Sequence, residues 1–178
     1  MILGIDVSTS TTGWAILNTN GKFIKADAFI LKNKTKFPDL FSKALYIQNQ
    51  IRHLHITYEF DRVFIESALM MFSPGKSSAS TISMLLKFNG IVSWIIYEET
   101  GIIPEFIPAV SARKLCGVIA PRGEKAKKCV MEHLLKTEPD FADIVQFTKH
   151  GNPSPEYFDM ADALIVSKAG YLKYYGKC

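Results

Sequence analysis

Cysteine and histidine are scarce in this chain of 178 residues. It has three cysteines, Cys116, Cys129 and Cys178, and four histidines. The cysteines are odd in number and show no C-x-x-C spacing, so neither a disulfide framework nor a zinc site is indicated. His53 and His55 are two positions apart and would point to different faces of a helix, which makes them a poor metal pair. We therefore expect a protein of a reducing compartment without structural zinc.

The chain also lacks a recognisable export signal and a long apolar run. Its first residues do not follow the basic-then-apolar order of a signal peptide, because Asp6 interrupts the apolar stretch. The most hydrophobic stretch, Ile82 to Tyr97, is shorter than a bilayer span of about 20 residues. It also contains Lys87 and Asn89. These features predict a cytoplasmic protein without membrane association, in which residues 80–100 form a core helix.

The composition favours one compact domain over residues 1–178, since 48% of the residues are hydrophobic. Lysine and arginine outnumber aspartate and glutamate by 21 to 17, giving a net charge of +4. Six of the basic residues fall within 16 positions: Arg113, Lys114, Arg122, Lys125, Lys127 and Lys128. Such clustering favours a polyanionic partner, and nucleic acid above all, although a solvated surface explains it equally well.

The start of the chain combines a buried strand with one carboxylate. Residues 2–5 are apolar or glycine, and Asp6 follows them. A run of serine and threonine then turns the chain, and residues 12–17 read as a second strand that could form a hairpin with the first. Burying an unpaired carboxylate is costly, so Asp6 needs a partner. RNase H-like nucleases and actin-like phosphotransferases begin in this way. The alternative is an aspartate that makes only local turn hydrogen bonds.

Residues 61–67 form another predicted strand. It carries an acid, Glu66, near its end and so repeats the pattern of residues 2–6. If it lies parallel to the first strand, both carboxylates emerge at the same edge of the sheet. Residues 22–31 and 105–108 read as further strands, and residues 37–58, 110–116 and 124–136 as helices, with Pro38 in the first turn of the first one. Residues 137–155 read as the loosest segment. The predicted fold is α/β, with three antiparallel strands followed by parallel strands in a mixed five-stranded sheet flanked by helices.

Two more acids lie on the last predicted helix, residues 156–175. Asp159 and Asp162 are three positions apart and share one helix face, where like charges are destabilising unless a cation joins them. With Asp6 and Glu66 they make a set of hard oxygen ligands, which favours Mg²⁺ or Mn²⁺ over zinc. Two such ions can activate a water molecule and stabilise the leaving oxygen in phosphodiester hydrolysis. The sequence therefore predicts a metal-dependent nuclease.

These motifs resemble the RuvC family of Holliday junction resolvases, over most of the chain. The resemblance rests on Ile2–Asp6 with Gly13, on Phe64–Glu66, on Gly123–Lys125 opening a helix, and on Asp159–Leu164. It implies an RNase H-like endonuclease that acts as a homodimer on four-way DNA junctions. Its four acids, Asp6, Glu66, Asp159 and Asp162, would hold two Mg²⁺ ions, with Mn²⁺ as a substitute.

The resemblance also implies positions that contact DNA. Lys125 would approach the scissile phosphate, and its loss should slow cleavage far more than the loss of Lys127. Further expected DNA contacts are Lys114, Arg122, Lys128 and Phe72. The family tends to have Pro-Gly after the first aspartate, where this chain has Val7-Ser8. A long proline-containing segment also precedes the last helix. Both departures indicate a divergent, phage-type member that acts in the cytoplasm of a bacterium or an infected host cell.

Three alternatives share part of this pattern. A broader branched-DNA or flap endonuclease would use the same acids. A non-catalytic junction-binding protein would not need the complete acid set. A small actin-like phosphotransferase would use the polar turn of residues 8–13 for phosphate, although the chain shows no second phosphate-binding glycine loop.

Overall fold

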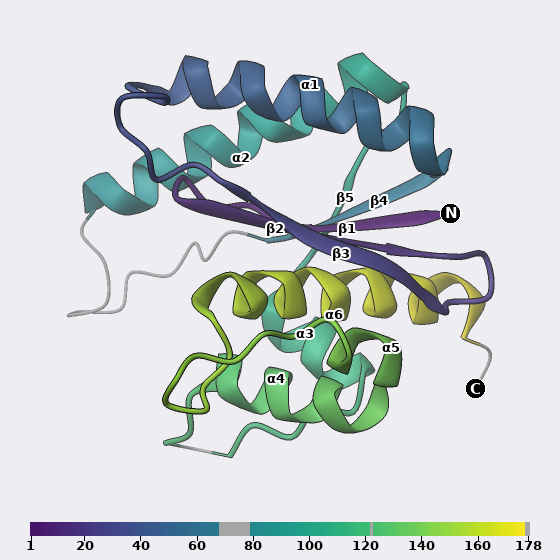
Figure 1. Ribbon diagram of the computed structural model, residues 1–178. Helices are drawn as coiled ribbons and strands as arrows, with labels where there is room; N and C mark the ends of the chain where they lie inside the picture. The colour runs from purple at the N-terminus through teal and green to yellow at the C-terminus, as the bar shows by residue number, and fades with distance from the viewer. Residues whose placement is uncertain (68–78, 122, 177–178) are drawn as a thin grey trace.

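A five-stranded sheet lies between two helical layers in the computed structural model, which describes residues 1–67, 79–121 and 123–176 (Figure 1). The strands are β1 (Ile2–Asp6), β2 (Thr11–Leu17), β3 (Phe23–Ile30), β4 (Arg62–Glu66) and β5 (Glu105–Ile107). The helices are α1 (Leu40–Tyr58), α2 (Ala79–Thr100), α3 (Ala109–Leu115), α4 (Ala126–Thr137), α5 (Pro139–Ala142) and α6 (Pro155–Tyr175). Helices α1 and α2 cover one face of the sheet, and α6 covers the other, with α3, α4 and α5 around it.

The strand order is β3-β2-β1-β4-β5. Strand β2 pairs antiparallel with β1 and with β3, whereas β4 pairs parallel with β1 and with β5. The hairpin between β2 and β3 is closed by Asn18, whose Oδ1 accepts hydrogen bonds from the backbone N–H groups of Asn20 and Lys22. The parallel β1–β4 pair needs a long crossover, which α1 supplies. The expected mixed sheet is therefore confirmed.

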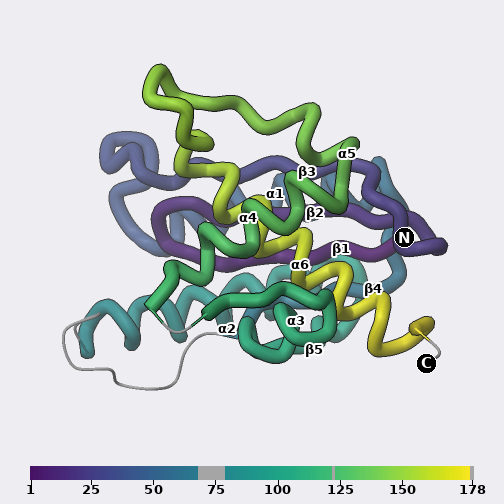
Figure 2. Tube along the Cα trace, turned by 90° about the horizontal axis from the view of Figure 1, so that it is seen from below, coloured from purple at the N-terminus to yellow at the C-terminus, as the bar shows by residue number. Residues whose placement is uncertain are grey.

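Each face of the sheet has its own apolar core. Side chains alternate along β1, so Leu3 and Ile5 pack under α1 and α2 while Ile2 packs on the α6 side. Both faces are covered, which explains why β1, β2 and β4 read as nearly continuous apolar runs rather than as alternating patterns. Figure 2 shows α6 crossing the face of the sheet opposite α1 and α2, beside α4 and α3.

Most predicted bounds agree with the structure to within a residue, but two helix starts and one segment expected to be loose differ more. Helix α1 begins at Leu40 and not at residue 37, because Asp39 forms a capping box with Ser42, so Pro38 lies outside the helix. Helix α4 begins at Ala126, which makes Lys125 its N-cap residue. The segment expected to be loose contains α5 and a β-bridge between Phe147 and Pro153.

Helix α2 is long and apolar enough to meet the length and composition criteria for a membrane span, with 28% of the qualifying window buried. A core helix of a soluble protein meets the same criteria. Five residues of α2 are buried: Phe88, Asn89, Val92, Ile95 and Ile96. Trp94 and Tyr97 on the same helix remain 62% and 45% exposed. Helix α2 therefore keeps an apolar surface outside the core.

Candidate active site

Two glycines let α6 lie directly on the sheet. Gly13 on β2 pairs in register with Asp6 on β1. A Cβ atom at Gly13 would lie 2.1 Å from the backbone oxygen of Asp159, and one at Gly4 would lie 2.3 Å from that of Ala163. Only glycine allows such an approach, since no larger side chain leaves room for the helix backbone. The contact at Gly13 therefore sets Asp159 of α6 beside the end of β1.

The two strand acids meet at one edge of the sheet. In the parallel register of β1 and β4, Ile5 pairs with Ile65, so Asp6 and Glu66 occupy equivalent positions at the ends of neighbouring strands. Asp162 on α6 is 6% exposed, and Asp159 is half-buried. The negative charge of Asp162 acts on both Asp6 and Glu66. The structure therefore brings together the four acids that the sequence singled out.

A lysine from α4 lies among these carboxylates. The Nζ atom of Lys127 is 2.7 Å from Oδ1 of Asp159, 3.0 Å from Oδ2 of Asp162 and 3.7 Å from Oδ2 of Asp6. Its own side chain remains 53% exposed, so the ammonium reaches the acids from the solvent side. Sequence reasoning placed Lys127 on the surface, because nothing in the spacing within α4 shows which of its lysines faces α6.

Burial and mutual repulsion perturb the acids strongly. Burial, more than the neighbouring carboxylates, raises the pKa of Asp6 to about 7 and that of Glu66 to about 8. The pKa of Asp162 is also raised, mainly by burial. Burial alone would lower the pKa of Lys127, but the attraction of Asp162 and Asp6 and the hydrogen bond to Asp159 outweigh it, so this pKa is raised. Clusters with such shifts mark functional sites more often than structural ones.

Arg113 adds a further positive charge near the cluster. Its guanidinium, on α3, lowers the pKa values of Glu66 and Asp162 and so opposes part of the effect of burial. The sequence grouped Arg113 with the basic segment but gave it no role at the site. The sequence shows that α3 follows directly after β5. Only the fold shows that β5 pairs with the strand of Glu66, which brings Arg113 near the acids.

The expected DNA contacts fall into two groups. Lys114, Lys125 and Lys128 are exposed, and Lys128 forms an ion pair of 3.6 Å with Glu132 one helical turn away. Lys125 and Lys128 line the same pocket as Lys127. Arg122 and Phe72 lie outside the described residues.

The acids offer only oxygen donors, which suits Mg²⁺ or Mn²⁺. Within residues 1–67, 79–121 and 123–176, no three acidic, histidine or cysteine side chains are arranged to hold a metal ion. The ammonium of Lys127, which contacts three of the carboxylates, is the cation at their centre in this structure. The donor chemistry therefore suits a hard divalent cation, while the ammonium of Lys127 occupies the position among the carboxylates in this structure.

Curated proteins of known name resemble this chain. No family model matches it. The chain is 32% identical to the crossover junction endodeoxyribonuclease RuvC of Aliarcobacter butzleri over 108 residues, which cover 60% of this chain and 66% of that protein. It is 29% identical to the RuvC protein of a Sulfurovum species over 117 residues, which cover 65% of the chain and 69% of the relative. The chain belongs to the RuvC family.

Solved structures agree with this family at the level of the fold. Thermus thermophilus RuvC in complex with a Holliday junction substrate superposes with a TM-score of 0.62 at 13% identity, covering 98% of this chain and 95% of the other. The yeast mitochondrial Holliday junction resolvase superposes with a TM-score of 0.63 at 16% identity, covering 98% and 80%. The RNase H-like fold expected of the RuvC family is therefore confirmed.

Proposed function

We propose that this RuvC-family chain is a metal-dependent endonuclease that cuts four-way DNA junctions by paired, symmetric nicks. The observation that carries the proposal is the gathering of Asp6, Glu66, Asp159 and Asp162 at one sheet edge, where Lys127 forms ion pairs with three of them. A structural ion pair would not need four carboxylates, whose mutual repulsion costs stability. The names of the RuvC relatives supply the substrate class.

The four acids would hold Mg²⁺ or Mn²⁺, and two ions are proposed. When bound, such ions activate the attacking water and stabilise the leaving oxygen of the phosphodiester. Lys127 bridges three of the acids in this structure, and its ammonium would have to leave them for a metal ion to bind there. Arg113 would favour the ionised forms of Glu66 and Asp162, against the larger effect of burial.

The exposed lysines around the acids would bind the DNA backbone. Lys125 and Lys128 border the acids from α4, and Lys114 lies on α3. Lys125 at the N-cap of α4 keeps its proposed place beside the scissile phosphate. Arg122 and Phe72 also stay in the proposal as DNA contacts. Such contacts give affinity and orientation rather than sequence preference.

The working unit is proposed to be a homodimer in the cytoplasm, built on the 1–178 domain. A four-way junction has approximate two-fold symmetry, whereas the described chain carries one acid cluster, so two symmetric cuts need two subunits or two visits. The exposed Trp94 and Tyr97 of α2, whose ring centroids are 5.8 Å apart, offer an apolar surface for the second subunit.

The test is cleavage of a synthetic four-way junction in Mg²⁺ by the protein and by Asp6→Asn, Glu66→Gln, Asp159→Asn and Asp162→Asn. Each substitution should abolish cleavage and leave junction binding intact, because it removes a metal ligand and no DNA contact. Binding should even improve, since less negative charge faces the phosphates. Near-normal cleavage by Asp6→Asn would refute the proposal.

Parallel three-way and flap substrates separate a resolvase from a broader branched-DNA endonuclease. A resolvase should cleave the four-way junction much faster than the others, whereas similar rates on all three would favour the broader enzyme. Junction binding without any metal-dependent cleavage would instead identify a binding protein.

A further inference from the structure

A pocket of about 720 Å³ opens next to the acid cluster, between α4, the start of α6 and the segment that joins α5 to α6. This volume is within the range of about 300–1,000 Å³ that small-ligand sites occupy. Asp159 and Lys127 belong both to the acid cluster and to the wall of this pocket. The nuclease function proposed above uses the acids and the lysines but leaves the apolar part of the pocket without a role.

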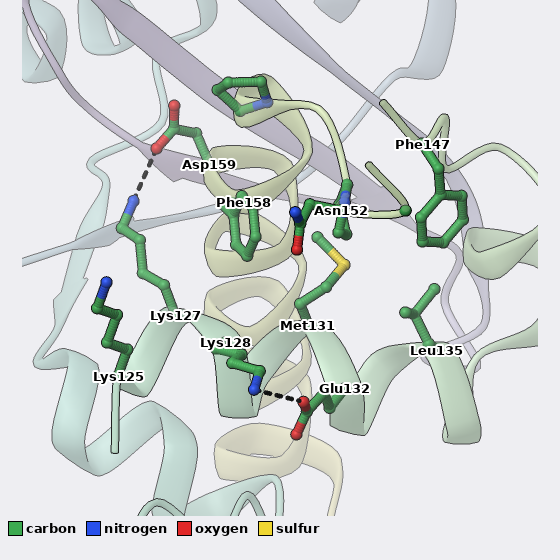
Figure 3. Close-up of a pocket in the computed structure, with 13 residues that line it drawn as sticks. Lys125, Lys127, Lys128, Met131, Glu132, Leu135, Phe147, Asn152, Phe158 and Asp159 are labelled. Carbon is green, nitrogen blue, oxygen red and sulfur yellow. Dashed lines mark hydrogen bonds and ion pairs between the residues drawn. The ribbon is translucent and has the colours of Figure 1, made fainter. Parts of the chain in front are cut away.

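The two ends of the pocket differ in character, and the ion pair of Lys128 with Glu132 lies along one side between them, as Figure 3 shows. Lys125, Lys127 and Asp159 lie at one end, while Phe147 and Leu135 lie at the other. Met131 and Phe158 lie between the two ends. The pocket therefore suits a ligand with an anionic group next to the acid cluster and a flat apolar group farther in.

The far wall is built by a small hairpin within residues 146–154. Phe147 forms a β-bridge with Pro153, and the backbone N–H of Thr148 donates to the oxygen of Asn152 at 2.8 Å. Gly151 closes the turn with a φ of 74°, in the left-handed region that favours glycine. The hairpin holds Phe147 at the pocket although 53% of the residue is exposed, which leaves its ring available to a ligand.

We propose that this pocket receives one unstacked nucleotide of the DNA strand, next to the phosphate that is cut. The inference rests on the proposed nuclease function and deepens it. The base would enter between Phe147 and Phe158, and its phosphate would meet Lys125 or Lys128. A base inside a duplex is stacked on both sides, so it must leave the stack to enter such a pocket. Bases at a branch point are already less constrained, which links the pocket to branched DNA.

Aromatic faces accept any base, because every base has a π-face. Stacking of one base on an aromatic side chain changes affinity by roughly 5- to 150-fold, the equivalent of about 1–3 kcal/mol. The lysines at the other end favour a nucleotide over an uncharged ligand or an apolar side chain of a partner protein. Charge and shape therefore both point to DNA as the occupant.

The first experiment places the fluorescent base analogue 2-aminopurine, in turn, at each position around the cut of a four-way junction. EDTA holds the complex uncut. One position should show a clear rise in fluorescence on binding, because the base leaves the stack. Phe147→Ala should change this signal, and Phe106→Ala should not, since Phe106 is similarly exposed at 49% but lies on β5. Equal signals from both variants would overturn the inference.

The second experiment couples the protein to the DNA. Removing the base at the responsive position should weaken binding or single-turnover cleavage by the wild-type protein about tenfold. The same removal should cost Phe147→Ala almost nothing, because the partner ring is already gone. Phe147→Tyr keeps a ring and should restore the wild-type sensitivity. This readout compares two DNAs on one protein, so a general folding defect of a variant cannot imitate it.

The outcomes separate the two proposals. If the wild-type protein does not cut the junction at all, the proposed nuclease function fails. If it cuts normally and the losses from Phe147→Ala and from base removal are independent, the nuclease function stands and the nucleotide pocket is wrong. Unchanged cleavage by Phe147→Ala would likewise overturn the pocket and favour a partner protein as its occupant.

Discussion

At the residue scale, Lys127 is the group whose place changes the interpretation of the site most. Three carboxylate oxygens lie within 3.7 Å of its ammonium, and the nearest is at 2.7 Å. A lysine in this position and a divalent cation cannot both occupy the centre of the same acids. Lys127 therefore holds the metal-free site together and competes with metal. For the same reason it cannot serve as a surface control for Lys125, and Lys136 is the better comparison.

We predict that Lys127→Ala lowers the melting temperature in EDTA and increases the stabilisation that Mg²⁺ provides. Without the ammonium, the acids repel one another until a metal ion neutralises them, and no competitor has to be displaced. Thermal unfolding across a Mg²⁺ titration measures both effects. Lys136→Ala, on the exposed last turn of α4, is the control. An unchanged Mg²⁺ response in Lys127→Ala would show that the lysine does not compete with metal.

The raised pKa of Asp6 predicts how stability depends on pH. A carboxyl whose pKa rises from its ordinary value of 3.8 to about 7 on folding binds more protons in the folded state. The free energy of unfolding therefore falls as the pH increases between these two values. In EDTA at pH 8, Asp6→Asn should melt at a higher temperature than the wild type, since the amide needs no proton.

The gain from Asp6→Asn should shrink toward pH 4, where the wild-type carboxyl is protonated in the folded protein. Loss of one partner of Lys127 offsets part of the gain at high pH. Asp143→Asn, at an exposed position, should show no such pH-dependent gain. Melting curves from pH 4 to pH 8 test this, and a gain that does not depend on pH would contradict the assigned cause.

At the element scale, the contact of α6 with β1 and β2 decides whether a site exists. Asp159 and Asp162 reach the strand acids only because α6 lies directly on Gly4 and Gly13. Gly170 continues this contact toward the C-terminal end of α6, where an added Cβ atom would meet the ring of Phe64. The glycines thus act on the site through the position of a whole helix.

We predict that Gly13→Ala destabilises the protein by about 1–3 kcal/mol, the usual cost of overpacking a core. It should also abolish junction cleavage, because the new methyl group pushes Asp159 away from Asp6. Gly90→Ala is the matched control, since a Cβ atom there meets nothing within 4 Å. Gly90 lies inside α2, so alanine should stabilise that helix by up to about 1 kcal/mol. Chemical denaturation should therefore show a lower free energy of unfolding for Gly13→Ala and a higher one for Gly90→Ala.

At the scale of the whole molecule, the exposed apolar surface of α2 bears on the assembly. Trp94 and Tyr97 lie on the α1–α2 layer, whereas α3, α4 and the nucleotide pocket lie on the other side of the sheet (Figure 1). A second subunit on α2 would leave the acid cluster open to DNA. This arrangement is consistent with two active sites facing one junction.

We predict that Trp94→Glu converts a dimer into a monomer in sedimentation experiments at micromolar concentration, because a buried charge without a partner is costly. On a supercoiled cruciform plasmid, the wild type should produce linear DNA within one binding event, and Trp94→Glu should give mainly nicked circles. Ile119→Glu is the control, because Ile119 is 82% exposed and lies on the α3–α4 side. A wild type that is strictly monomeric would favour a branched-DNA nickase.

The sequence by itself determined the strands, the mixed character of the sheet and the four acids. These features depend on local signals: apolar runs that end in Asp6 and Glu66, a hairpin turn, and the helical spacing of Asp159 and Asp162. The parallel pairing of β1 with β4 was a condition of the predicted site, and the structure shows it.

Only the tertiary structure decided which lysine of α4 meets the acids, why Gly4 and Gly13 matter, and where the nucleotide pocket lies. The glycines matter because α6 lies directly on the sheet. The lysine and the pocket depend on the distances between α4, α6 and the 146–154 hairpin, and on the rotation of α4 about its axis. Residue spacing fixes directions within one helix but not the position of that helix against another. Packing between distant segments sets that position, so Lys127 rather than Lys125 lies at the centre of the acids.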